Sequence, residues 1–288
     1  MSDFWRRGIR SAPVISIVVT FAVLYRHVAI ELFRAWSTDD NYSHGFLIVP
    51  ISAYLAWERR DRFARLPQRP ALFGLVVVLA SLGLLVVGTL GAELFLTRVS
   101  MIGVLAGTIL FLAGWAHLRV MAFPVGFLLL MIPLPALIFN QIAFPLQLLA
   151  SQAGATAVSA FGVPVLREGN LIVLSHATLE VAEACSGIRS LVSLLTLGIV
   201  YAYFIDPRTW MRLAIVISTI PVAILANAIR VAGTGVAAEY LGAEAAEGFF
   251  HGFSGWALFL VACGALIGIH HLLQSSWRMA ERFRLRAA

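Results

Sequence analysis

Residues 71–91 read ALFGLVVVLASLGLLVVGTLG, and this uncharged apolar run decides the fold class. A helix of about 20 apolar residues spans a hydrocarbon core of about 30 Å. Similar runs recur along the 288 residues, of which 60% are hydrophobic and only 12% are charged. Because a soluble protein of this size needs more charge, and because a spanning segment must satisfy its own backbone hydrogen bonds, the sequence predicts an all-α polytopic membrane protein.

Eight membrane-spanning helices are expected from these apolar runs. They cover about residues 12–33, 44–57, 71–91, 95–114, 120–139, 188–205, 212–236 and 252–273. We interpret residues 1–288 as a single integral membrane domain. The first run follows Arg6, Arg7 and Arg10 and lacks a small-residue cleavage site, so it is expected to be a retained span and not a cleaved signal peptide.

The arginines predict the orientation of the bundle. All 21 basic residues are arginine, and eight spans would place 15 of them on one side of the membrane. By the positive-inside rule that side is the cytoplasm, and both termini lie there. The arginines stand mostly at the ends of apolar runs, which is a topology signal and not the footprint of a nucleic-acid-binding protein. No nucleic-acid partner is therefore expected.

One apolar segment does not fit the eight-span scheme. Residues 140–161 carry several glutamines and serines, and a crossing there would place the arginine-rich C-terminal tail outside. We expect a helix that lies along the outer interface or re-enters the membrane, with a further crossing as the alternative. Residues 162–187 alternate apolar and polar side chains around Glu168-Gly169-Asn170, which predicts a short extracytoplasmic hairpin.

The sequence EACSGIRS, residues 183–190, joins this hairpin to the next span and contains one of only two cysteines. In the expected topology Cys185 lies at the outer border of the membrane. Arg230 lies near the outer end of the seventh span, with Asn227 on the same helix face, and His251 lies at the outer start of the eighth. A charged side chain within a span is a functional candidate by default, because its burial is costly.

These three groups predict a cysteine acyl-transfer site. A thiol becomes a good nucleophile when a nearby His or Arg lowers its pKa. His251 would take the thiol proton, or form its ion pair, and protonate the leaving amine. Arg230 would donate to the oxyanion. For each of Cys185, Arg230 and His251, a purely structural role is the alternative. Cys263 lies deep in the last span and is expected to have only a packing role.

Six further residues are weaker candidates for binding substrate or supporting the site. They are Glu183, Ser186, Arg189, Asn227, His44 and Tyr42. Ser186 would need a stronger base than a thiol needs. Arg189 would bind a lipid phosphate or a substrate carboxylate, while Tyr42 and His44 would line the substrate cleft or cap a helix. No metal-binding spacing is present, so no metal or cofactor is expected.

The sequence contains three blocks in the order EACSGIRSLVSLL, NAIRV and HGFSGW. Together they resemble the motifs of the exosortase/archaeosortase family. The stretch NYSHGFLIVPISAYLAWERR resembles the N-terminal region of that family, so the resemblance covers about residues 30–275. It implies an enzyme of the bacterial inner membrane whose Cys, Arg and His correspond to Cys185, Arg230 and His251, with the active site facing the periplasm. The C-terminal periplasmic domain of some relatives is not expected here.

The resemblance also implies the partners. These are exported proteins with a C-terminal sorting tail, which consists of a short motif such as Pro-Glu-Pro, a transmembrane helix and a basic cluster; they are commonly associated with extracellular polysaccharide. The identity of the acyl acceptor is not predicted. Membrane lipid is expected to surround the helix bundle. Two other classes also stay open: a transporter or lipid-binding scaffold, and an acyltransferase that uses Cys185 on lipid-linked substrates. A transporter would more often show internal repeats and broken helices, which the sequence lacks.

Overall fold

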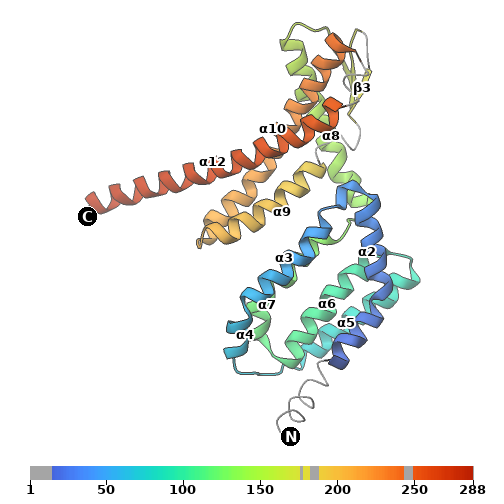
Figure 1. The fold of residues 1–288 in the computed structure, drawn as a ribbon, viewed down its shortest axis with the longest axis vertical. Coiled ribbons are helices and arrows are strands. Elements are labelled where there is room, and N and C mark those ends of the chain that lie inside the picture. Colours follow the sequence, from blue (N-terminus) through green and yellow to red (C-terminus); the bar gives the residue numbers. More distant parts are fainter. Residues whose placement is uncertain (1–14, 176–177, 182–187, 243–248, 288) are drawn as a thin grey trace, which may run out of the picture. The chain divides into compact units, whose positions relative to one another are not determined.

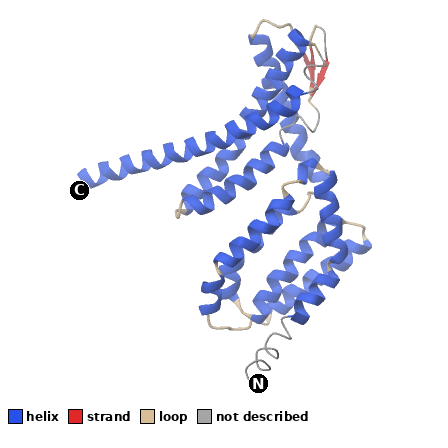
Figure 2. Ribbon diagram, in the orientation of Figure 1, coloured by secondary structure: helices blue, strands red, loops and turns tan. Residues whose placement is uncertain are grey.

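The computed structural model describes residues 15–175, 178–181, 188–242 and 249–287. Figure 2 shows that helices make up nearly all of the described chain, together with one small sheet. The predicted all-α polytopic membrane fold is therefore confirmed. The chain forms two compact units, one ending at Pro135 and the other beginning at Ala136, and each is described by itself.

Five described helices are long and apolar enough to cross a membrane, or up to seven if each of two bent helix pairs counts as one span. The five are α5 (Phe73–Leu90), α6 (Leu94–Leu112), α9 (Ile188–Ile205), α10 (Thr209–Leu241) and α12 (Phe249–Ala287). Each corresponds to a predicted span. The last two helices are longer than expected, and α12 continues far beyond the predicted end at residue 273.

The first unit also contains shorter elements. They are α2 (Arg26–Thr38), η1 (Asp40–Tyr42), α3 (Gly45–Glu58), α4 (Arg60–Arg65), α7 (Trp115–Phe127) and η2 (Leu128–Met131). The predicted first span is bent: a helical stretch over Ile15–Leu24 meets α2 at 59°. Tyr25 stands at this bend, is buried, and lies 3.1 Å from Ser100 through its hydroxyl oxygen, which attaches the bend to α6.

The predicted span 120–139 is divided, because the helical segment ends at Met131. The following residues, Ile132-Pro133-Leu134-Pro135, include two prolines, which lack a backbone donor and disfavour helix in the residue before them. Side chains from elsewhere in the unit satisfy the carbonyls that the break leaves free. Trp36 donates through Nε1 to the Met131 carbonyl oxygen at 2.9 Å, for example.

The second unit begins with α8 (Ala136–Ala160), which covers the predicted interfacial segment and starts earlier than expected. It is followed by a three-stranded antiparallel sheet in the order β1-β2-β3. The strands are β1 (Leu166–Glu168), β2 (Leu171–Val173) and β3 (Thr178–Glu180). Glu168 pairs with Leu171 and Gly169 has a φ of 65°, so the predicted hairpin and its turn are confirmed.

The sheet is attached to α8 and α10. Ile172, Val158 and Val231 belong to one buried apolar cluster, and Ser151 of α8 donates a hydrogen bond to the Gly169 carbonyl at 2.8 Å. The other face of α10 packs against α9 and α12. Figure 1 shows these three helices side by side, with the sheet close to α8. The helices α9, α10 and α12 enclose the candidate site.

Candidate functional site

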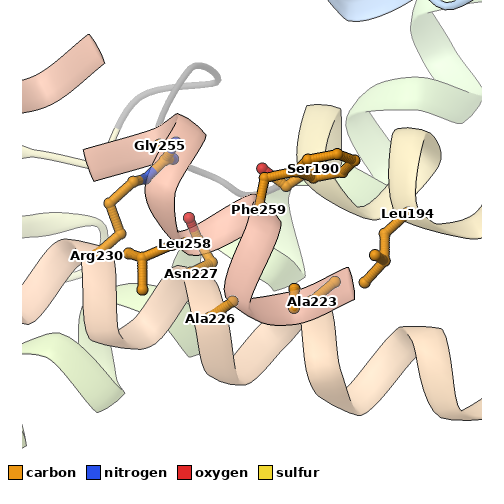
Figure 3. A pocket seen from close by; sticks show the side chains of 10 residues that line it. Ser190, Leu194, Ala223, Ala226, Asn227, Arg230, Gly255, Leu258 and Phe259 are labelled. Atoms are coloured by element: carbon orange, nitrogen blue, oxygen red, sulfur yellow. The ribbon is translucent and has the colours of Figure 1, made fainter. Parts of the chain in front are cut away.

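A pocket opens between α9, α10 and α12 in the second unit (Figure 3). Its polar side chains are those of Ser190, Asn227 and Arg230, and Gly255 lies beside them. Its apolar part is lined by Leu194, Ala223, Ala226, Leu258, Phe259 and Ala262. The pocket therefore has one polar end and one apolar end.

Arg230 reaches from α10 towards α12. Figure 3 shows its side chain directed at Gly255, and a Cβ atom added at Gly255 would stand 3.6 Å from its Nη1 atom. A Cβ atom would therefore make only an ordinary contact, whereas a side chain larger than alanine at this position would enter the space of the guanidinium. Asn227 is 5% exposed and also lines the pocket, so the predicted common helix face of Asn227 and Arg230 is confirmed.

The polar residues of the pocket lie at one end of the three helices. Ser190 is in the first turn of α9, Arg230 in the C-terminal half of α10, and Gly255 near the start of α12. Leu194, Ala223 and Ala262 lie farther from that end and belong to an apolar cluster that closes the pocket at its base.

Several predicted site residues cannot be placed in this pocket from the described chain. Cys185, Glu183 and Ser186 lie outside the described residues. His251 is in α12, four residues before Gly255, but its side chain is not among those that the structure describes. Arg189 is the second residue of α9 and is partly buried. The convergence of thiol, guanidinium and imidazole therefore stays a prediction.

Tyr42 and His44 belong to the first unit, and their relation to the pocket is not described. His44 is 8% exposed and stands at the N-terminus of α3, but its side chain does not cap that helix. Its Nε2 atom lies 3.2 Å from the carbonyl oxygen of Leu130. The ring centroids of Tyr42 and His44 lie 6.4 Å apart. His44 thus holds the end of η2 in place, and its role in substrate binding stays a prediction.

Ser190, Gly255 and the apolar lining were not singled out as site residues from the sequence. Ser190 is the last residue of EACSGIRS, and Gly255 is the fifth of HGFSGW, so both stand inside blocks that had drawn attention for other residues. The apolar lining has no such signal, because alanine and leucine occur throughout the spans.

A second polar cluster lies at the opposite end of α9. Asp206 follows this helix, and its carboxylate Oδ2 lies 2.7 Å from Nη2 of Arg208. The hydrogen bonds from Arg208 hold the pKa of Asp206 at about 2. In the same cluster, the hydroxyl oxygen of Tyr201 lies 2.9 Å from Nδ1 of His270. Among the described residues, no three His, Cys, Asp or Glu side chains form a group that could hold a metal ion.

The fold and the pocket define a polytopic helical membrane protein with a candidate reaction site between three of its helices. The family comparison is more specific, because the model of the transmembrane exosortase family matches residues 36–268. The chain therefore belongs to the exosortase family, and the resemblance of its motifs is confirmed. No curated protein and no solved structure gives a match. Family membership indicates a multi-pass membrane protein involved in the sorting and processing of exported proteins.

Proposed function

We propose that this exosortase is a cysteine transpeptidase or protease that cleaves the C-terminal sorting tail of exported proteins. The observation that carries this proposal is the pocket in which Arg230 of α10 lies against Gly255 of α12. This contact joins two of the three sequence blocks, and Ser190, which belongs to the remaining block EACSGIRSLVSLL, lines the same pocket.

The remaining two reactive residues are tethered to this pocket by the chain. His251 is four residues before Gly255, and therefore about 6 Å away along the axis of α12 and on the same helix face. Cys185 is three residues before Ile188, the first residue of α9, and three residues of chain reach about 10 Å at most. These limits are compatible with a common site.

The reaction follows from the chemistry of the three groups. The Cys185 thiolate attacks the carbonyl carbon of the scissile peptide bond, and Arg230 donates to the oxyanion that forms. The C–N bond then breaks, His251 protonates the leaving amine, and the N-terminal fragment stays on Cys185 as a thioester. Attack by water gives hydrolysis, whereas attack by an amine gives transpeptidation and releases the thiolate.

The substrate tail supplies much of its own orientation. Its transmembrane helix can pack beside the helices of the enzyme, so that the motif before the helix is held at the level of the pocket. This arrangement requires the polar end of the pocket to face the periplasm from the inner membrane. The basic cluster of the tail then lies in the cytoplasm.

Co-expression with a protein that carries a Pro-Glu-Pro tail tests this function. The wild-type enzyme should shorten the tail, and Cys185→Ala should abolish the shortening, because the thioester cannot form. Cys263→Ala is the matched control, since Cys263 packs beside an apolar cluster away from the polar end and should be dispensable. Mass spectrometry of the new C-terminus would give the cut site and any attached acceptor. Shortening by the Cys185→Ala variant would refute the proposal.

A further inference from the structure

Strand β3 forms one edge of the small sheet (Figure 1). The order of the sheet is β1-β2-β3, so β3 pairs with β2 on one side only among the described strands. Helix α8 packs mainly against β1 and β2, and the side chain of Thr178, the first residue of β3, is exposed. An edge strand of this kind presents backbone donors and acceptors that can pair with another extended chain.

The register of the sheet shows which backbone groups of β3 point to this edge. The N–H of Val181, directly after β3, donates to the carbonyl oxygen of Asn170 at 2.9 Å. In an antiparallel pair, hydrogen-bonded positions alternate with positions whose N–H and C=O point away from the partner strand. Leu179, two residues before Val181, therefore faces β2 with its backbone groups. The N–H and C=O of Thr178 and Glu180 point outward.

The C-terminal end of β3 lies at the level of Arg230. Val181 is buried and belongs to the same apolar cluster as Val231, the residue after Arg230 in α10. Cys185 is five residues after Glu180, and five residues of chain reach about 18 Å at most. The edge of β3 therefore leads towards the residues that the proposed reaction uses.

We propose that β3 binds the substrate by strand addition, in which the residues before the cleaved bond pair with its outer edge in an extended conformation. Main-chain hydrogen bonds supply the affinity of such complexes. This inference rests on the proposed function, which puts the sorting motif at the level of Arg230. The residues before the cleaved bond lie outside the transmembrane helix of the tail, so their backbone groups are available. An extended polypeptide is the ligand whose donors and acceptors alternate as those of β3 do.

Strand addition makes a prediction about the substrate that does not depend on its side chains. In an added strand every second N–H points to the neighbouring strand, and here two of them would meet the carbonyl groups of Thr178 and Glu180. Proline lacks this donor, so it should be harmful at two tail positions that are two residues apart and tolerated between them. The prolines of a Pro-Glu-Pro motif are also two residues apart, so both can face away from β3.

A proline scan of the tail tests this pattern. Each residue of the sorting motif and of its flanks is replaced in turn by Pro and by Ala, and each purified tail is cleaved by the full-length enzyme in detergent. The ratio of kcat/KM between the Pro and Ala tails should fall roughly 3–10-fold at the two sensitive positions, the effect of one lost hydrogen bond. It should stay close to one between them. A flat profile, or a run of adjacent sensitive positions, would overturn the inference.

Thr178→Pro tests the same contact from the enzyme side. It removes an N–H that points away from β2, and proline is tolerated at such edge positions, so the pairing with β2 is kept. Thr178→Ala retains the N–H and is the matched control. Thr178→Pro should raise KM roughly 3–10-fold with little change in kcat, because the bond is made before and during the reaction. It should also weaken the alternation in the proline scan. An alternation of unchanged size would mean that the tail pairs elsewhere, and would overturn the inference.

The alkylation rate of Cys185 by iodoacetamide, measured in a Cys263→Ala background, shows whether Thr178→Pro leaves the site intact. If this rate falls, Glu180→Pro removes the second outward N–H instead, with Glu180→Ala as its control. The scan with the wild-type enzyme depends on neither variant.

Two other outcomes are distinguishable from these. A flat scan, together with conversion of a dimer into a monomer by Thr178→Pro, would overturn the inference and show that a second copy of the chain pairs with β3. Cleavage without Cys185 would instead refute the proposed function, whatever the β3 variants do.

Discussion

At the scale of single residues, Arg230 stands out among the described residues of the candidate site, because it is a charged side chain within a membrane helix. A guanidinium inside a membrane bundle is costly unless it is paired or hydrated. Arg230 is half-buried, lies at the polar end of a pocket, and packs over a glycine on the neighbouring helix. Its position therefore depends on Gly255 as well as on its own helix.

The size of the side chain at residue 255 should control activity. A Cβ atom at Gly255 would make an ordinary contact with Nη1 of Arg230 at 3.6 Å, so Gly255→Ala should retain most of the rate of tail cleavage. Gly255→Leu would displace the guanidinium and should lower the initial rate by about 10²-fold, as expected for a lost oxyanion donor. Time courses of tail shortening measure both.

Gly264→Leu is the control for this prediction, because it lies on the same helix and no atom lies within 4 Å of an added Cβ. It should cleave at the wild-type rate. If Gly255→Leu were as active as Gly255→Ala, the position of the guanidinium would not matter for the reaction.

At the scale of elements, α5 and α6 show how helices associate without a hydrophobic driving force between them. Small residues let the two backbones approach closely: a Cβ added at Gly74 would stand 2.6 Å from the Cα atom of Phe111, and one at Gly107 would stand 2.9 Å from the backbone nitrogen of Val78. The packing of this pair therefore depends on residues that have no side chain.

Gly74→Ala should destabilise the protein, although alanine is the better helix former. Its methyl group would overlap the backbone of α6, and overpacking of this kind costs about 1–3 kcal/mol. Gly83→Ala on the same helix meets nothing within 4 Å and should keep or slightly raise the melting temperature. Thermal unfolding in detergent measures both variants. Equal melting temperatures would show that α5 and α6 are not packed this closely.

At the scale of the whole molecule, the orientation of the second unit depends on whether α8 crosses the membrane. If α8 lies along the outer interface or re-enters, residue 170 faces the periplasm and the C-terminus lies in the cytoplasm. Alkaline phosphatase fused after residue 170 should then be active, and green fluorescent protein fused after residue 288 should fluoresce. An inactive phosphatase together with a dark C-terminal fusion would mean that α8 crosses and that the pocket faces the cytoplasm.

Local sequence patterns were sufficient where one segment determines its own structure. The turn at Gly169 and the helix over 188–205 were predicted correctly, because turn chemistry and apolar length act within a few residues. Over 120–139 the helix is broken after Met131, because Pro133 and Pro135 follow, and apolar composition alone did not indicate this break. The bend at Tyr25 had no such signal.

The candidate site was predictable only in part. The sequence placed Asn227 and Arg230 on one face of one helix, since helical periodicity is a local property. It did not indicate that Arg230 lies against Gly255, or that Ala226 and Leu258 line a pocket between helices. The contact of His44 with Leu130 could not be predicted from the sequence either, because it joins residues that are far apart in the chain.

The amino-acid sequence by itself determined that this chain is a helical membrane protein of the exosortase family, with its reactive residue types in three blocks. Hydropathy, turn chemistry and residue order are all properties of one segment at a time. Only the tertiary structure decided which helices enclose the pocket and which residues form its polar and apolar ends. In a membrane, close packing and a few polar contacts select the neighbours of a helix, and these depend on shapes that come together only in the folded bundle.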